Sequence, residues 1–268
     1  MKVGIIGMGF VGSAVKAGLT MRDIIDVKCV DIDPSKGFMH TIADLYDCDG
    51  IFVCVPSPQN DDGTCDTYIL ENVLSQLKDY KGAIISKVTA PPDVYRRLNN
   101  LYPNLVHSPE FLTAADAVRD YLNASFCIIG GDVTAYRNEA ERIIRVSQGN
   151  LKEIYHCKIE EASLAKYTIN SFLATKVVFM NEMYQLSKKS NVRFEILAKL
   201  ISADTRIGNS HLRVPGPDGS LGFGGYCFPK DTSAILKYAE SVDVNLNIID
   251  AAVKKNIILR LSEDDNDR

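Results

Sequence analysis

The sequence predicts an α/β protein in which a doubly wound parallel sheet is followed by a mostly α-helical domain. Short apolar runs alternate with helical or irregular segments in the first part of the chain, and a glycine-rich turn directly follows the first of these runs. Beyond residue 158 the apolar residues recur at helical spacing instead. We therefore expect two domains, residues 1–158 and residues 159–268.

The glycine-rich turn predicts a dinucleotide site of Rossmann type. Gly7, Gly9 and Gly12 form a GxGxxG pattern between a short apolar strand and a helix-like segment at residues 11–19. The pattern alone is a weak signal, and the strand and helix around it make it informative. Gly7 permits a tight turn, Gly9 leaves room for a pyrophosphate, and Gly12 lets helix and strand pack closely.

An acidic residue at the end of the second strand indicates which cofactor is bound. Asp31 ends the strand at residues 27–30 and follows Gly12 by 19 positions, the spacing at which an acid meets the adenosine ribose hydroxyls. A carboxylate there repels a 2′-phosphate, so NAD is favoured over NADP, and Lys36 is the nearby cation. Asp33 replaces Asp31 if the strand register slips by two, or both acids simply form the turn.

Further strands place several loops at the predicted binding edge. The strand-like runs lie at residues 50–55, 82–88, 104–108, 126–131 and 151–157. Three of them lead into Val-Pro-Ser-Pro at 55–58, Thr-Ala-Pro-Pro at 89–92 and Pro-Glu-Phe-Leu at 109–112. Ligands of such sheets bind beyond the carboxyl ends of the strands, so these loops are expected to converge on the cofactor. Alternatively, each proline cluster simply marks a loop and has no role in binding.

Composition excludes several functions. The formal net charge of −4, with charges of both signs mixed, gives no surface for nucleic acid or acidic membranes. No apolar run is long enough to span a bilayer, and Met1 leads directly into a strand with no secretory signal. We expect a soluble, cytoplasmic protein. Seven cysteines without a CxxC pair and four scattered histidines predict no metal site and a reducing compartment.

The second half is predicted to contain a helix of about thirty residues, at 160–189. On it Lys166 and Asn170 are four apart and share one face. A cation and an amide placed together suit an alcohol or a developing oxyanion. The alternative is a solvated lysine beside a polar neighbour.

A cysteine in a glycine-rich segment is the candidate nucleophile. Cys227 lies in Gly-Phe-Gly-Gly-Tyr-Cys-Phe-Pro-Lys-Asp at 222–231. Glycines let backbone amides approach a ligand, and nearby lysines favour the reactive thiolate. Alternatively the cysteine is a buried small apolar residue. Asp231 precedes a helical run at 232–240 and could act only as its cap.

Together these motifs, in this order and with an Arg-Ile-Gly segment at 206–208, resemble the UDP-glucose/GDP-mannose dehydrogenase family over nearly the whole chain. The resemblance implies two successive NAD-dependent oxidations that take the C6 alcohol of a nucleotide sugar to a uronate. The first candidate reaction is the conversion of UDP-glucose to UDP-glucuronate, as in polysaccharide biosynthesis. Cys227 would capture the aldehyde as a thiohemiacetal that becomes a thioester. Lys166 and Asn170 would stabilise the charged oxygen, while Asp231 would position water.

The resemblance also assigns binding roles. Glu110 and Thr89 would help order the water and the nicotinamide. The positions that match cofactor contacts are Gly7, Gly9, Val11, Gly12, Asp31, Lys36, Ser57, Thr89 and Lys230. The positions that match substrate contacts are Glu110, Lys166, Asn170, Arg206 and Gly224. A homodimer through the central region is implied as well.

The chain departs from the family pattern at three places. Ala114 stands where the family often has a second acid, and the loop at 211–221 is longer than the compact family version. Only 41 residues follow Cys227, so we expect the family's carboxyl-terminal nucleotide-binding domain to be lacking. Two other functions therefore stay open: a one-step NAD-dependent β-hydroxyacid dehydrogenase, and a non-catalytic NAD-binding partner subunit.

Overall fold

A computed structural model describes residues 1–21, 25–36, 40–113 and 115–264. The chain divides into two compact units: Met1–Asn60 with Cys65–Lys166, and Asp61–Thr64 with Tyr167–Arg268. This division falls inside a long helix, eight residues beyond the boundary expected after residue 158. The two predicted domains, with their boundary after residue 158, stay a prediction.

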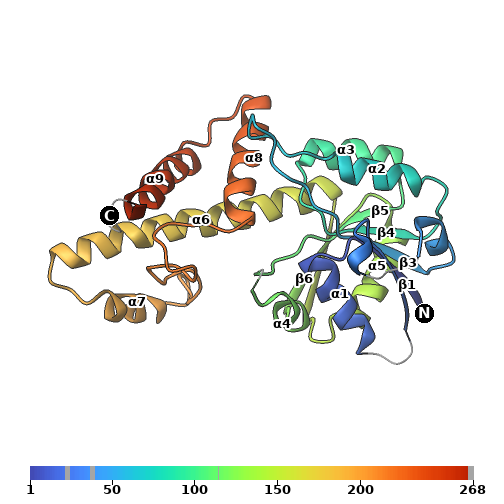
Figure 1. Ribbon diagram of the computed structural model, residues 1–268, viewed down its shortest axis with the longest axis horizontal. Coiled ribbons are helices and arrows are strands. Elements are labelled where there is room, and N and C mark those ends of the chain that lie inside the picture. Colours follow the sequence, from blue (N-terminus) through green and yellow to red (C-terminus); the bar gives the residue numbers. More distant parts are fainter. Residues whose placement is uncertain (22–24, 37–39, 114, 265–268) are drawn as a thin grey trace. The chain divides into compact units, whose positions relative to one another are not determined.

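The first unit is built on a sheet of seven strands among the residues described, in the order β2-β1-β3-β4-β5-β6-β7 (Figure 1). The strands run parallel from β2 through β5, so their carboxyl ends meet at one edge. Four-residue stretches of β3 and β4 are completely buried, as expected of a sheet covered on both faces. The strands are β1 (Lys2–Ile6), β2 (Asp26–Val30), β3 (Gly50–Val53), β4 (Ala83–Ser86), β5 (Leu105–His107), β6 (Phe126–Gly130) and β7 (Glu153–Cys157).

The last two strands, β6 and β7, run opposite to the other five. β6 pairs antiparallel with β5, with His107 opposite Gly130, and β7 then runs parallel to β6. The reversal follows from the connection at residues 108–125, which begins at the carboxyl end of β5 and starts β6 from that same edge. The predicted doubly wound α/β fold is confirmed, with this single antiparallel pair as the difference.

Helices cover both faces of the sheet and enclose two cores (Figure 1). One face carries α1, α4 and α5, and the other carries α2 and α3. Each core contains a fully buried tyrosine whose hydroxyl is satisfied: Tyr121 pairs with Ser147 at 2.7 Å, and Tyr95 pairs with Ser86 at 2.7 Å. The helices are α1 (Phe10–Thr20), α2 (Tyr68–Gln76), α3 (Pro92–Leu101), α4 (Ala117–Leu122) and α5 (Thr134–Ser147), with short 3-10 helices at Pro34–Lys36 and Ile42–Leu45.

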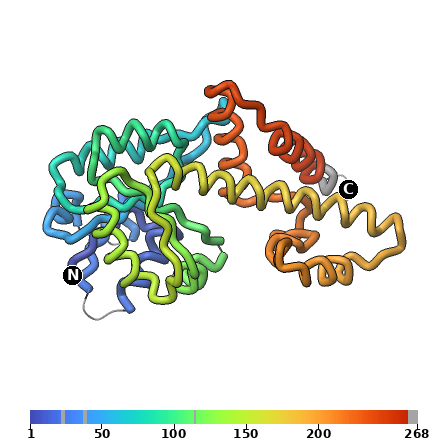
Figure 2. The backbone as a smooth tube through the Cα atoms, turned by 180° about the vertical axis from the view of Figure 1, so that it is seen from behind, coloured from blue at the N-terminus to red at the C-terminus, as the bar shows by residue number. Residues whose placement is uncertain are grey.

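The second unit is helical. Figure 2 follows α6 as one unbroken helix, which confirms the long helix expected at 160–189. One core of this unit joins α6 to α9 through Ala174, Val178 and Leu259. Phe223, from the loop before α8, packs among them. None of the helices in the part of the chain that the structure describes is both long and apolar enough to cross a membrane. The helices are α6 (Ile159–Lys189), α7 (Phe194–Ser202), α8 (Cys227–Ser241) and α9 (Asn247–Asp264).

Candidate active site

The first glycine turn has the geometry that a pyrophosphate requires. Gly7 has φ +89°, and a Cβ on it would lie 2.8 Å from the carbonyl oxygen of Cys54. A Cβ on Gly12 would lie 2.0 Å from the Gly7 oxygen, so strand and helix touch there. A Cβ on Gly9, by contrast, would have no heavy atom of the described residues within 4 Å, apart from Gly9 itself and its two chain neighbours. Helix α1 begins at the next residue. The turn therefore leaves open space at a helix amino terminus, which fits a dinucleotide phosphate.

Asp31 is held against this turn. Its Oδ2 accepts hydrogen bonds from the Met8 amide at 2.6 Å and from Lys36 Nζ at 2.8 Å, and its Oδ1 accepts one from the Asp33 amide at 2.9 Å. Burial opposes the charged form, yet the bonds from Lys36 and the two amides together lower the pKa of Asp31. The Asp33 carboxylate instead binds Ser35. The geometry thus favours Asp31 over Asp33 as the ribose ligand.

The loops after β3 and β4 are joined at the same edge of the sheet. Ser57 Oγ donates to the Thr89 carbonyl at 2.7 Å, and the Cys65 thiol contacts that carbonyl at 3.5 Å. The structure therefore brings the predicted residues Ser57 and Thr89 together.

Val11, another predicted cofactor contact, lies in the first turn of α1 and packs against the core beneath that helix.

Glu110 uses its backbone and its side chain differently. Its carbonyl accepts a hydrogen bond from Lys166 Nζ, so these two predicted residues meet. Its carboxylate forms an ion pair with Lys87, whose side chain is 1% exposed and whose ammonium also donates to Ser108 Oγ at 3.1 Å. Sequence reasoning missed Lys87. A lysine inside the mostly apolar run at 82–88 was the available signal, because a buried ammonium needs an anionic partner.

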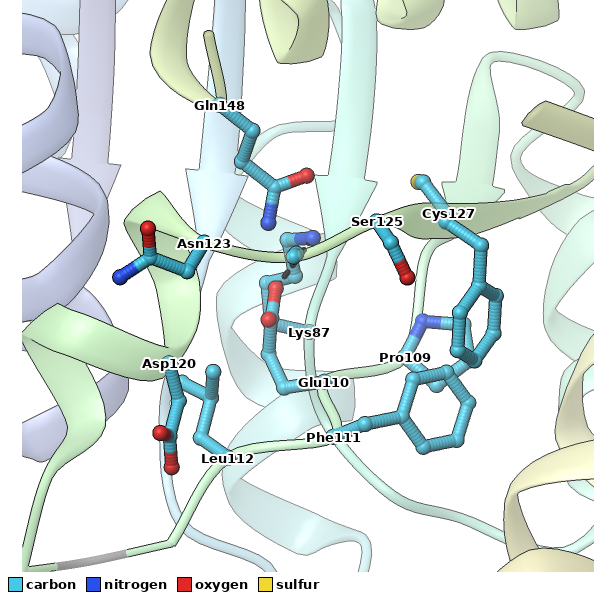
Figure 3. Close-up of a pocket in the computed structure, with 12 residues that line it drawn as sticks. Lys87, Pro109, Glu110, Phe111, Leu112, Asp120, Asn123, Ser125, Cys127 and Gln148 are labelled. Atoms are coloured by element: carbon cyan, nitrogen blue, oxygen red, sulfur yellow. Dashed lines mark ion pairs between the residues drawn. The ribbon is translucent and has the colours of Figure 1, made fainter. Parts of the chain in front are cut away.

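The Lys87–Glu110 pair lies in a cavity of about 350 Å³. Figure 3 shows Gln148, from the end of α5, pointing toward Lys87 and Glu110, with Phe111 at one wall. The Phe111 and Phe126 rings lie 5.2 Å apart. Gln148 is 3% exposed, and its Oε1 has no hydrogen-bond partner among the described residues. The cavity is therefore polar at its base and suited to ordered water.

In the second unit, Asp231 is the centre of a buried polar cluster. Asn170 Nδ2 donates to Asp231 Oδ2 at 2.6 Å, and Lys230 Nζ contacts Asp231 Oδ1 at 2.5 Å. All three residues are buried. α8 begins at Cys227, so Asp231 lies inside the helix, and the alternative that it only caps a helix starting at 232 is wrong.

Cys227 opens α8 behind a left-handed glycine turn. Gly222 and Gly225 have φ +71° and +74°, a region that favours glycine. Cys227 is half-buried, and the structure gives all seven cysteines as thiols. A sulfur at the first position of a helix faces the positive end of the helix dipole, which stabilises an anion.

The remaining predicted residues differ in their surroundings. A Cβ on Gly224 would lie 2.2 Å from Arg260 Nη2, so the Arg260 guanidinium lies close against this glycine. The Arg206 side chain is 88% exposed and binds Asp204, two residues earlier, at 2.6 Å. Ala114 lies outside the described residues.

Two family models match the chain. Residues 36–148 match the NAD binding domain of the UDP-glucose/GDP-mannose dehydrogenase family, and residues 160–257 match its central domain. The chain belongs to this family. The resemblance inferred from the motifs is thereby confirmed, and so is the expectation that the cofactor is NAD.

Curated relatives agree. A UDP-glucose 6-dehydrogenase of Rickettsia felis is 31% identical over 226 residues, covering 80% of this chain and 48% of that protein. A UDP-glucose 6-dehydrogenase of Campylobacter jejuni is 29% identical over 291 residues, covering 96% of this chain and 72% of that protein. The chain thus spans about half of the first relative.

Solved structures share the fold. A UDP-glucose dehydrogenase from Pyrobaculum islandicum has a TM-score of 0.80 at 24% identity, covering 96% of this chain and 68% of that one. A 3-hydroxyisobutyrate dehydrogenase from Mycobacterium tuberculosis has a TM-score of 0.74 at 16% identity, covering 94% of this chain and 91% of that one. At these identities the likeness concerns the fold alone, and two kinds of dehydrogenase share it.

Proposed function

We propose that this protein oxidises the C6 alcohol of a nucleotide sugar to the carboxylate with NAD, with UDP-glucose as the first candidate substrate. The observation that carries the proposal is the buried Asp231 cluster on the helix that Cys227 opens. A one-step alcohol dehydrogenation has no use for a nucleophilic thiol, whereas a two-step oxidation needs one to hold the carbonyl carbon between the steps.

In this proposal NAD, when bound, supplies the hydride acceptor for both oxidations. The Cys227 sulfur bonds to the aldehyde carbon after the first oxidation, giving a thiohemiacetal, and carries the acyl group as a thioester after the second. Water then attacks the thioester carbon, the carbon–sulfur bond breaks, and the sulfur regains its proton. The products are the uronate and the thiol.

Asp231 is suited to the hydrolysis step. Each of its carboxylate oxygens accepts one hydrogen bond, from Asn170 or Lys230, and keeps a lone pair for water. The two donors fix the carboxylate in a buried place, where it can orient and activate a water molecule. Lys166 and Asn170 stabilise the negative oxygen, and Glu110 and Thr89 order water beside the nicotinamide.

The substrate remains the open part of the proposal. Besides UDP-glucose, the names of structural neighbours suggest GDP-mannose and UDP-N-acetylmannosamine for a panel of substrates. Arg206 and Gly224 are the proposed substrate contacts. Incubation with NAD should give two NADH per sugar for the correct substrate, and Cys227→Ala should abolish carboxylate formation.

The second candidate is a one-step β-hydroxyacid dehydrogenase, because a lysine and an asparagine on one helix face, here Lys166 and Asn170, also suit the alcohol of a hydroxyacid. One NADH per small hydroxyacid, unaffected by alkylation of the cysteines, would select it. The third candidate is a non-catalytic NAD-binding partner subunit. Calorimetric NAD binding without turnover on either panel would select that one.

We also propose a homodimer through the second unit. Phe172, Phe179 and Leu186 on α6 are each more than half exposed and are spaced by seven residues, the repeat of a helix–helix seam. Light scattering should give a dimer at micromolar concentration, and Phe179→Asp should give a monomer, whereas Lys188→Ala should not. A monomeric wild-type protein would overturn this part of the proposal.

A further inference from the structure

We infer that two asparagines, Asn181 on α6 and Asn256 on α9, are positioning residues that fix the glycine turn leading to Cys227. The inference rests on the proposed function, because it concerns how the thiol is presented for the second oxidation. All of its residues belong to the second unit. We call residues 222–225 the presenting turn.

Asn256 binds both backbone groups of one residue in the presenting turn. Its Oδ1 accepts a hydrogen bond from the Phe223 amide at 2.6 Å, and its Nδ2 donates to the Phe223 carbonyl at 3.0 Å. Asn256 is 8% exposed, so these bonds are made away from solvent. A planar amide offers a donor and an acceptor side by side, whereas an apolar side chain would leave two buried backbone groups unpaired.

Asn181 holds the preceding residue from another helix. Its Oδ1 accepts a hydrogen bond from the Gly222 amide at 3.1 Å, while its Nδ2 donates to the Val177 carbonyl at 2.8 Å. The second bond anchors the amide to its own helix and orients the oxygen toward the turn. Asn181 is 1% exposed. Two asparagines that lie 75 positions apart in the chain, on different helices, thus hold adjacent residues of the turn.

The space around the turn is filled by the same side chains. A Cβ on Gly222 would lie 2.3 Å from Asn256 Oδ1, so the amide occupies the place a larger residue would need. Gly224, Gly225 and Tyr226 then separate Phe223 from Cys227, and the two glycines give the backbone many conformations. The asparagines supply the order that the glycines do not.

A surface pair closes the outer side of the turn. Arg260, one helical turn after Asn256 on α9, pairs with Asp218 at 2.8 Å, and its guanidinium lies against Gly224. Both side chains are about one third exposed or more, so solvent screens the pair. The buried asparagines, and not this pair, are therefore expected to determine where the turn lies.

The first test measures the thiol directly and needs no substrate. Alkylation of Cys227 by iodoacetamide is followed by site-resolved mass spectrometry in the wild-type protein, Asn256→Leu and Asn181→Leu. Loss of the asparagine hydrogen bonds to the presenting turn should expose the half-buried sulfur of Cys227 and raise its alkylation rate at least threefold. The matched control is Asp250→Asn, which breaks an exposed pair with Lys254 on α9 and should leave the rate unchanged.

The second test uses product ratios. With the thiol misplaced, the first oxidation continues while capture of the aldehyde slows, so NADH per sugar should fall from two toward one and free aldehyde should appear. A role confined to stability would not change this ratio. Should Asn256→Leu fail to fold, Asn256→Asp serves, because it keeps the acceptor for the Phe223 amide and replaces the donor with a carboxylate oxygen that the Phe223 carbonyl repels.

The outcomes separate the two claims. Faster alkylation in both asparagine variants, with two NADH per sugar in the wild type, supports the positioning role and the proposed function. Faster alkylation in the variants, with no turnover by the wild-type protein, supports the positioning role of the asparagines and overturns the proposed function. Unchanged alkylation of Cys227 in folded variants overturns the inference, whatever the wild-type activity.

Discussion

Asn170 Nδ2 lies 2.6 Å from Asp231 Oδ2, and this bond joins α6 to α8 in the interior of the second unit. Lys230 binds the other carboxylate oxygen at 2.5 Å. Three polar side chains therefore share one buried site in which each depends on the others. Removing one partner from such a site leaves the others unpaired, and this makes Asp231 the most informative residue to change.

Asp231→Asn should stop the proposed reaction at the acyl-enzyme stage. The amide keeps the size of the side chain but cannot take a proton from water, and loss of general-base catalysis typically lowers a rate by about 10²- to 10⁴-fold. Rapid mixing should show an NADH burst followed by a steady rate reduced to that extent. The control Glu240→Gln, an exposed carboxylate on the same helix, should keep the wild-type rate. A burst-free variant with unchanged turnover would remove Asp231 from the mechanism.

Asp31→Ala should change the choice between NAD and NADP. It removes the ribose acceptor, and it releases Lys36, which then becomes available to a 2′-phosphate. NAD affinity should fall about tenfold or more, by analogy with the loss of a charged hydrogen bond, while NADP affinity rises. Titration calorimetry with both cofactors measures this. Asp33→Ala is the matched control, since its carboxylate binds only its own turn, and equal effects of the two variants would contradict the assignment.

Lys87→Met should destabilise the first unit, because it leaves the buried Glu110 carboxylate without its partner. Breaking a buried ion pair in this way typically costs about 3–5 kcal/mol of unfolding free energy. Urea denaturation of Lys87→Met and of the double variant Lys87→Met/Glu110→Gln measures it, and the double variant should recover much of the loss. If the double variant were as unstable as the single one, the pairing would not be the cause.

The sequence predicted the parts of the site that depend on local spacing. Gly7 and Gly12 follow from the contacts of a tight strand-to-helix turn, and Asp31 follows from the length of the first helix and second strand. Lys166 and Asn170 follow from the helical repeat. In each case a few neighbouring residues determine the geometry, so the pattern can be read without the fold.

Other parts depend on residues far apart in the chain. Lys87 and Glu110 meet because β4 and β5 are adjacent strands, and Asn256 reaches Phe223 across 33 positions. The sequence predicts the start of α8 at 232, five residues too late, because glycines and Pro229 are typical of loops. A proline is tolerated in the first turn of a helix, where its missing N–H has no partner to lose. The reversal of β6 likewise depends on which edge a connection returns to.

His107 gives a prediction for the pH dependence of stability. It is fully buried, its ring stacks on Tyr95 with centroids 4.0 Å apart, and its Nδ1 lies 3.2 Å from the Ser86 carbonyl oxygen. Burial lowers its pKa to about 3, well below its ordinary value of about 6.5 in the unfolded chain. Between these two pH values the unfolded chain binds a proton that the folded protein does not.

Stability must therefore fall as the pH is lowered from 7 toward 5. The slope is about 1.4 kcal/mol per pH unit once the unfolded histidine is protonated, so this residue removes about 2 kcal/mol of unfolding free energy over that interval. His107→Gln keeps a hydrogen-bonding side chain and does not titrate there. Urea denaturation at pH 7 and pH 5 should show the wild-type protein losing about 2 kcal/mol more than the variant. Equal losses in both proteins would mean that carboxylates and the other histidines, and not His107, determine the acid response.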